Sequence, residues 1–163
     1  MQRQLKLAQM PSVFCIDASA LVDLKRWYPD HMKTFTPIWK AIDQLIKRGR
    51  LISPLEVQKE ISIGNDEIVK WCKNNKIIFK DVDDCQIQEI QNVQDKYDTY
   101  YWEREINKTG FWGDPWVIAL SICEEAIIVT NENKEKPNRI PAISREFNIT
   151  SLQLLEFFKE IGI

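Results

Sequence analysis

The chain is poor in the residues that build most zinc sites and catalytic triads. Its 163 residues include a single histidine, His31, and four cysteines that show no C-x-x-C spacing. One histidine supplies neither the usual nitrogen ligands of zinc nor an evident base for a serine or cysteine nucleophile. Most of the cysteines lie within apolar patterns, so we expect reduced, buried thiols rather than disulfides or zinc ligands. The cysteines are Cys15, Cys72, Cys85 and Cys123.

Glycine and proline are also scarce, with five and seven residues respectively, which leaves little room for long linkers. No apolar run approaches the roughly 20 residues that span a membrane. The first eight residues lack the apolar core of a signal peptide. We therefore expect one cytoplasmic domain over residues 1–163 without a membrane segment, in which residues 1–11 form a flexible N-terminal extension.

Neither sign of charge dominates, because 22 basic residues face 24 acidic residues and the net charge is −2. The molecule as a whole therefore exerts no strong pull on nucleic acid, and any such contact must come from local patches. Basic residues of surface loops often serve only solubility. Two patches are candidate RNA-binding groups, Lys25 with Arg26 and Lys134 with Lys136 and Arg139.

Short apolar runs alternate with amphipathic stretches along the whole chain. The runs predict strands near residues 12–17, 51–53, 77–79, 127–130 and 149–151. Helical spacing lies between them, including one long stretch from Asp84 to about Lys108. Strands that alternate with helices favour an α/β fold with a central parallel sheet of four or five strands and helices on both faces.

Four acidic residues follow the predicted strands or begin the helices after them. They are Asp17, Glu60, Asp114 and Glu132, and Glu56 lies one turn before Glu60. Because parallel strands end at one edge of a sheet, these carboxylates are expected to meet in one cleft. Such a cluster is too repulsive unless protons or divalent cations neutralise it. The pattern therefore predicts a metal site.

Carboxylate oxygens are hard ligands that suit Mg²⁺ or Mn²⁺. We expect Asp17 as the central ligand and Asp114 as a second ligand, direct or through water. Glu60, as a further ligand, and Glu132 are expected to complete the catalytic cluster or to orient metal-bound waters. The hydroxyls of Ser19 and Thr130 are expected to support these carboxylates. The chemistry that such a site favours is phosphodiester hydrolysis by metal-activated water, without a covalent enzyme intermediate.

Each acid also has a purely structural interpretation. Asp114 before Pro115 is a good helix N-cap, and Glu56 suits the first turn of a helix through the helix dipole. Glu60 resembles many surface glutamates, and Glu132 lies in a charged loop. Asp17 is the exception, because an acid directly after four apolar strand residues risks an unpaired buried charge.

The ordered set of segments resembles PIN-domain proteins, and in particular the DUF4411 family of prokaryotic PIN-like proteins. The segments are Phe14–Leu21, Ile52–Ile61, Gly113–Leu120 and Val129–Glu132, together with the turn Trp27–Pro29 and the ending Ile140–Ile163. The resemblance covers nearly the entire chain from about residue 12. It implies a single-domain PIN-like fold and a Mg²⁺- or Mn²⁺-dependent ribonuclease.

The same resemblance implies the toxin of a toxin–antitoxin pair, with an antitoxin protein as partner, and a homodimer. It matches Asp17, Glu60 and Asp114 to the acidic core, and Thr130 with Glu132 to the region of the fourth acid. Many PIN domains have an aspartate at the fourth site, where this chain reads Thr130-Asn131-Glu132. Glu60 is preferred to Glu56 because the PIN glutamate usually precedes an aliphatic residue, here Ile61.

Three other functions remain open. A catalytically silent module could bind RNA or protein through aromatics that stack on bases, although helical aromatics mostly pack inside. These aromatics are Tyr97, Tyr100, Tyr101, Trp102, Trp112 and Trp116. An aspartyl-nucleophile phosphatase usually has a second aspartate where this chain has Ser19. A phosphorylation-receiver domain would need paired acids beside Asp17, and none lie there.

Overall fold

A five-stranded parallel sheet forms the centre of the protein, which we describe from a computed structural model over residues 11–63 and 66–163. The strand order is β3-β2-β1-β4-β5. The strands are β1 (Phe14–Ile16), β2 (Leu51–Pro54), β3 (Phe79–Lys80), β4 (Ile127–Val129) and β5 (Ser151–Leu152). All four pairings are parallel, with Phe14 opposite Leu51 and Ile127 on its two neighbours. The predicted α/β fold with a central parallel sheet and flanking helices is confirmed.

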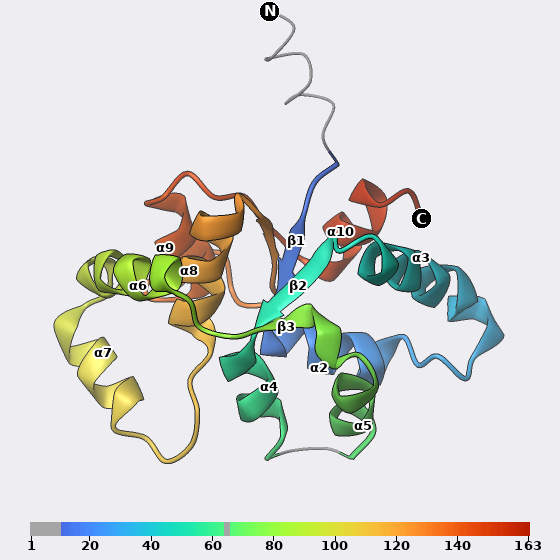
Figure 1. Cartoon of the computed structure of the whole chain (residues 1–163), viewed down its shortest axis with the longest axis horizontal. Coiled ribbons are helices and arrows are strands. Elements are labelled where there is room, and N and C mark those ends of the chain that lie inside the picture. Colours follow the sequence, from blue (N-terminus) through green and yellow to red (C-terminus); the bar gives the residue numbers. More distant parts are fainter. Residues whose placement is uncertain (1–10, 64–65) are drawn as a thin grey trace, which may run out of the picture.

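Helices connect the strands and cover both sides of the sheet. They are α2 (Ala18–Trp27), α3 (Thr36–Lys47), α4 (Leu55–Ile61), α5 (Asp66–Asn74), α6 (Asp84–Lys96), α7 (Thr99–Ile106), α8 (Asp114–Glu124), α9 (Ile140–Arg145) and α10 (Leu154–Glu160), with short 3₁₀ turns η1 (Lys33–Phe35) and η2 (Lys76–Ile78). Figure 1 shows α6, α8 and α9 on one side of the strands, α3 and α10 on the other, and α2, α4 and α5 beyond the carboxyl ends of β1 and β2. Within the described ranges, no helix is long and apolar enough to cross a membrane.

The central strand β1 is buried on both faces, as expected of a strand in the middle of a parallel sheet. Phe14, Cys15 and Ile16 are almost completely inaccessible to solvent. Side chains of this strand therefore lie against helices on both sides, and the burial continues into Asp17. The sheet thus places the Asp17 carboxylate at a buried position at its carboxyl edge.

The predicted helix over residues 84–108 is wrong in one respect, because it is two helices that break at Tyr97 and Asp98. The Asp98 carboxylate accepts a hydrogen bond from the Tyr101 backbone N–H at 2.9 Å and so begins α7. The Asp98 N–H donates to the Asn138 side chain at 2.8 Å. The apolar stripe runs across the break, which is why helical periodicity alone does not reveal it.

Two other boundaries differ by a few residues. Residues 76–78 form a 3₁₀ turn, and β3 begins at Phe79, so the strand predicted at 77–79 lies further along. The strand predicted at 149–151 is β5 at Ser151–Leu152. The predicted flexible extension, residues 1–11, lies outside the described residues apart from Pro11.

The prediction of reduced thiols is wrong for two cysteines. Cys85 and Cys123 form a disulfide, whereas Cys15 and Cys72 are free and buried. The disulfide joins α6 to α8, whose Cα atoms at these positions lie 6.1 Å apart because the two helices pack against each other. That proximity depends on tertiary packing over 38 residues of sequence, and no local spacing motif records it.

Candidate metal centre

Asp17 lies at the junction of β1 and α2, and every feature of its surroundings orients its carboxylate. Its side chain is the N-cap of α2, where Oδ1 accepts a hydrogen bond from the Ala20 N–H at 2.9 Å. The Ser19 hydroxyl lies 2.9 and 3.0 Å from the two carboxylate oxygens. Thr130 donates to Oδ2 at 2.8 Å. Asp17 is only 1% exposed, so these donors replace the water that it loses.

Thr130 connects Asp17 to Glu132. It directly follows β4, the strand that pairs with β1, and the Asp17 backbone N–H donates to the Val129 carbonyl at 3.0 Å. The Thr130 hydroxyl donates to Asp17 and accepts a hydrogen bond from the Glu132 N–H at 3.1 Å. One hydroxyl therefore fixes both the carboxylate of Asp17 and the backbone that carries Glu132.

Asp114 is the first residue of α8, and Gly113 occupies the N-cap position without a side-chain cap. The structural interpretation of Asp114 as a cap is therefore wrong. Gly113 approaches α4 so closely that an added Cβ would lie 2.9 Å from both Glu60 Oε2 and Val57 Cγ2. The Gly113 N–H donates to Glu60 Oε2 at 3.1 Å. The absence of a side chain at Gly113 thus lets α8 bring Asp114 beside α4.

Asp17, Asp114 and Glu132 meet at the carboxyl edge of the sheet. One carboxylate oxygen from each lies within 4.8 Å of the others. Glu60 belongs to the same neighbourhood through its bond to Gly113, but it is not a member of this close group. The structure therefore brings together three of the four predicted acids and places the fourth, Glu60, beside them.

Burial raises the pKa of each of these carboxyl groups, and the charge of Asp114 adds to the rise for the other three. Burial, followed by the charge of Asp114, raises the pKa of Asp17 to about 7 and that of Glu60 to about 7. The same causes raise the pKa of Glu132 to about 10. Burial also raises the pKa of Asp114. The Arg139 guanidinium opposes the shift for Asp114 and Glu132, but it does not cancel it.

This donor set fits a divalent cation. The three carboxylates offer only hard oxygen ligands, which Mg²⁺, Mn²⁺ and Ca²⁺ prefer. A cation between them would offset the repulsion that otherwise favours protonation. The buried hydroxyl of Tyr97 has no hydrogen-bond partner in the described structure, and Asp114 and Glu132 lie near enough to add to the rise in its pKa that burial causes. A buried Tyr97 hydroxyl without a partner among the described residues, near Asp114 and Glu132, suits a site that binds a polar ligand.

The sequence matches the family model "Domain of unknown function (DUF4411)" over residues 14–163. The chain belongs to the DUF4411 family. No curated protein matches the sequence. Among solved structures, the crystal structure of PAE2754 from Pyrobaculum aerophilum is similar, with 16% sequence identity and a TM-score of 0.48. That alignment covers 94% of this chain and 98% of that chain.

Glu56, the first glutamate of α4, lies apart from the close acidic group of this DUF4411 protein. Glu56 forms an ion pair with Lys59 at 3.0 Å, one turn along the same helix. Glu60 instead reaches the N-terminus of α8. Of the two glutamates, Glu60 is thus the one beside the metal centre.

The predicted basic residues occupy different places. Lys25 pairs with Asp30 at 3.0 Å and Lys134 pairs with Glu156, so both are engaged away from the carboxylates. Arg139 donates to the Tyr101 hydroxyl and lies near enough to Asp114 and Glu132 to lower their pKa values. Arg26 is exposed and lines a groove with Ser19 and Glu60. Arg139 and Arg26 are therefore the predicted cations that the structure places next to the site.

The aromatic stripe mostly packs on itself. Tyr97, Trp102 and Trp112 contact one another edge to face, with ring centroids 5.2–5.4 Å apart. Tyr101 stacks on Tyr97 at 6.1 Å. Only Tyr100 is largely exposed, at 74%. For most of the stripe the packing interpretation is therefore the correct one.

Sequence reasoning missed three contributors to the site. Gly113 has a role that depends on a helix contact, although its position directly before Asp114-Pro115 is a usable local signal. Asn131 forms hydrogen bonds with residues of α2 and α10. Nothing in the sequence of its polar loop signals this role. Tyr97 was assigned to a continuous helix, so its position at a helix break beside the acids was not expected.

Proposed function

We propose that this DUF4411 protein is a metal-dependent endoribonuclease that hydrolyses RNA phosphodiester bonds, and that it is the toxin of a prokaryotic toxin–antitoxin pair. The observation that supports hydrolysis is the convergence of Asp17, Asp114 and Glu132 within 4.8 Å, where Asp17 is buried and the other two are half-buried, so that protons or a cation must neutralise them. The choice of RNA and the toxin role rest on the resemblance of the acidic segments to PIN-domain proteins.

In this proposal Asp17, Asp114 and Glu132 hold Mg²⁺ or Mn²⁺, and Glu60 stands beside them. The bound ion supplies Lewis-acid activation of water and charge neutralisation at the phosphodiester. Ser19 and Thr130 hold the Asp17 carboxylate in one orientation. Arg139 supplies a fixed positive charge on the side of Asp114 and Glu132.

The deciding experiment replaces carboxylates by amides of the same shape. Asp17→Asn and Asp114→Asn are each expected to reduce Mn²⁺-dependent RNA cleavage by at least about 100-fold, because groups that merely orient metal ligands are worth about 10–100-fold. Asparagine still caps a helix, so Asp17→Asn keeps α2. Cleavage is measured on a labelled RNA with and without metal, and folding by circular dichroism.

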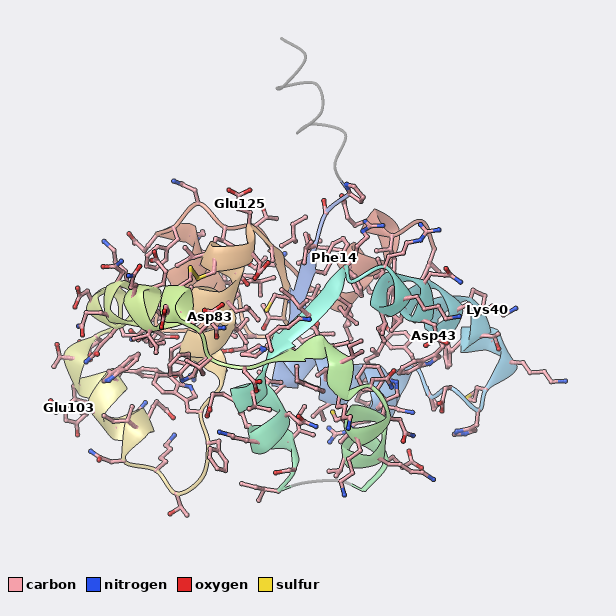
Figure 2. All side chains as sticks on the ribbon, viewed as in Figure 1. Phe14, Lys40, Asp43, Asp83, Glu103 and Glu125 are labelled. Carbon is pink, nitrogen blue, oxygen red and sulfur yellow. A yellow bond between two sulfur atoms is a disulfide. The ribbon has the colours of Figure 1, made fainter. Side chains whose placement is uncertain are left out.

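Asp83 provides a matched control for Asp17. It also caps a helix, α6, and accepts a hydrogen bond from the Gln86 N–H at 2.9 Å, but it is exposed on the segment that leads into α6 (Figure 2). Asp83→Asn should therefore cut RNA as fast as the parent. Glu56→Gln, on α4 and outside the close acidic group, is a second control and should also cut RNA as fast as the parent. Parent-like cleavage by both Asp17→Asn and Asp114→Asn would end the nuclease proposal.

A catalytically silent module that binds RNA or protein is the second candidate, and the exposed ring of Tyr100 is the feature that favours it. Tight RNA binding without cleavage or metal binding would support this module. For the toxin role we expect a homodimer and an antitoxin partner encoded nearby. Light scattering that gives a monomer mass at high concentration would reject the homodimer.

A further inference from the structure

A groove of about 480 Å³ opens beside the metal centre. Its lining comes from α2, α4 and α5. The lining residues are Ala18, Ser19, Val22, Asp23, Arg26, Glu60, Ile61 and Ile68. The volume lies in the range of about 300–1,000 Å³ that is typical of ligand pockets.

The groove is continuous with the acidic site. Ser19 lines it and donates to both oxygens of Asp17. Glu60 also lines it and accepts from the N-terminus of α8, directly before Asp114. A ligand whose reacting group meets the carboxylates would therefore extend along this groove.

The apolar part of the groove lining is aliphatic. Ile61 and Ile68 are buried, and Val22 is half-buried on α2. Such surfaces favour the planar, apolar faces of a nucleobase over a charged group. The aliphatic walls thus suit the part of a nucleotide that the metal centre cannot bind.

Two charged side chains give the groove polarity. Arg26 is exposed and forms no ion pair with any residue in the described ranges. Asp23 is half-buried, and its Oδ2 accepts a hydrogen bond from the Asn131 side chain at 2.9 Å. A carboxylate accepts several hydrogen bonds, so Asp23 is held in place while it retains capacity for donors of a ligand.

Asn131 makes the position of Asp23 rigid. Its side-chain oxygen accepts from the Leu154 N–H at 3.1 Å, and its backbone N–H donates to Ser19 at 3.1 Å. Asp23 therefore shares one hydrogen-bonded frame with the metal centre. This arrangement is that of a fixed acceptor at the edge of a binding pocket.

We propose that this groove binds one nucleotide of single-stranded RNA, next to the phosphodiester that meets the metal centre, and that it prefers guanine. The base lies against Val22, Ile61 and Ile68. Asp23 accepts hydrogen bonds from the adjacent N1–H and N2–H groups of guanine, and Arg26 contacts a neighbouring phosphate. The strand must be single because pairing in a duplex occupies that edge of the base. This inference rests on the proposed ribonuclease function, since RNA as the ligand comes from it.

The test measures binding, so that it does not depend on cleavage. Fluorescence anisotropy is recorded for the full-length Asp114→Asn variant with labelled uridine octamers that carry one central guanosine, inosine or adenosine. Inosine lacks only the N2 amino group. We expect guanosine to bind at least about fivefold more tightly than inosine or adenosine, because a site that accepts an N–H rejects an analogue that lacks it.

Substitutions in the groove locate the binding. Val22→Trp fills the groove and should weaken binding of the guanosine octamer by at least about tenfold. Val22→Phe is the smaller substitution to use if Val22→Trp lowers the melting temperature. Ile149→Trp is the matched control, because Ile149 is also half-buried but lines a separate groove of about 370 Å³. Ile149→Trp should bind like the parent.

Substitutions of Asp23 and Arg26 should change RNA binding in different ways. Asp23→Asn should bring guanosine and inosine to within about twofold of each other, because the amide offers one acceptor where the carboxylate offers two. Arg26→Gln should weaken all three octamers alike and reduce the salt slope by about 0.7, the value for one lost contact to a single strand. Lys40→Gln removes the same charge from the exposed face of α3, far from α4 in Figure 2, and should leave both quantities unchanged.

The outcomes separate this proposal from the nuclease proposal. Equal affinity for the three octamers, or unchanged binding by folded Val22→Trp and Val22→Phe, overturns the groove proposal. If the parent cleaves RNA with Mn²⁺ while these binding results are negative, only the groove proposal fails. If the parent cleaves nothing but guanosine binds as described, the groove proposal stands and the nuclease proposal fails.

Discussion

Two unlike walls enclose the candidate metal centre. One, the tied wall, consists of α6, α7 and α8; it carries the packed rings of Tyr97, Trp102 and Trp112 and the disulfide between α6 and α8. The other, the open wall, consists of α2, α4 and α5; it contains the groove, whose apolar lining is aliphatic. Covalent and aromatic contacts thus concentrate on one side of the same site, and accessible space on the other.

The difference indicates a division of roles between the walls. The tied wall positions Asp114, since α8 is buried in the core and joined to α6. The sheet positions Asp17 and Glu132 through β1 and β4. The open wall then leaves space for a ligand beside these acids. A site whose charged groups sit on rigid elements needs little rearrangement when a cation binds.

The largest expected effect is a pH dependence of folding stability, which arises from the carboxylates between the walls. An acid with a raised pKa in the folded state binds protons more tightly there than in the unfolded chain, so stability is full below the unfolded pKa and falls as pH rises through the folded pKa. Asp17 and Glu60, with pKa values of about 7, define a loss between about pH 4 and pH 7, and Glu132 extends it toward pH 10.

For Asp17 alone the loss is on the order of 4 kcal/mol, at about 1.4 kcal/mol per pKa unit. Thermal unfolding in EDTA should therefore show a melting temperature that decreases steadily from pH 5 to pH 9. Added Mn²⁺ should restore more stability at pH 8 than at pH 5, because protons compete with the ion. Asp114→Asn should flatten the pH dependence. A metal-free melting temperature that rises over this range would contradict the prediction.

The next effect probes the tied wall. Cys85→Ala with Cys123→Ala should lower the free energy of unfolding by about 3 kcal/mol, because the disulfide no longer restricts the unfolded chain. Denaturant unfolding measures the change. Dithiothreitol should cause the same loss in the parent and none in the variant, which provides an internal control. Parent-like stability of the variant would show that the tied wall does not depend on its covalent link.

A smaller effect concerns the contact where the two walls meet. Gly113→Ala places a methyl group against Val57 and Glu60 on α4 and should cost about 2 kcal/mol through overpacking. It should also slow cleavage, because α8 must move away from α4 and carry Asp114 with it. Val57→Ala combined with Gly113→Ala should cost less than the sum of the two single substitutions. Strict additivity would mean that Gly113 does not contact α4 as described.

The smallest effect concerns the aromatic part of the tied wall. Tyr97→Phe removes a buried hydroxyl without a partner, so stability should stay the same or rise by up to about 1 kcal/mol. Tyr100→Phe, at an exposed ring, is the control and should change nothing. A clear loss of stability in Tyr97→Phe alone would reveal that its hydroxyl has a partner in solution.

The sheet was predictable because parallel strands leave continuous apolar runs such as Val13–Ile16, and helices leave periodic ones. The meeting of the acids at one edge of the sheet was then predictable, because each acid follows a strand or begins the helix after it. The local role of each acid did not follow, and the two aspartates show why. Asp114 precedes a proline and fits a cap on sequence grounds, yet Gly113 is the N-cap. Asp17, for which the sequence favours a functional explanation, is itself a helix cap.

What the sequence did not reveal depends on contacts between distant segments. The pairing of Cys85 with Cys123 requires α6 to lie against α8, and the break at Tyr97 is held by Asn138 from another loop. Periodicity reports which side of a helix is apolar but not which helix it meets. Such contacts determine the detailed geometry of the site. Residue patterns therefore predict the acids of the site better than the residues that position them.

The hydrogen bond from the Leu154 backbone to Asn131 makes α10 part of the framework of the candidate site. A chain shortened just before α10 would keep every carboxylate, yet it would release Asn131 and loosen its hold on both Asp23 and Ser19. Deletions at the carboxyl end would thus act on ligand recognition from a distance. Fusion partners attached beyond Ile163 leave that bond intact and are the safer choice for labelling.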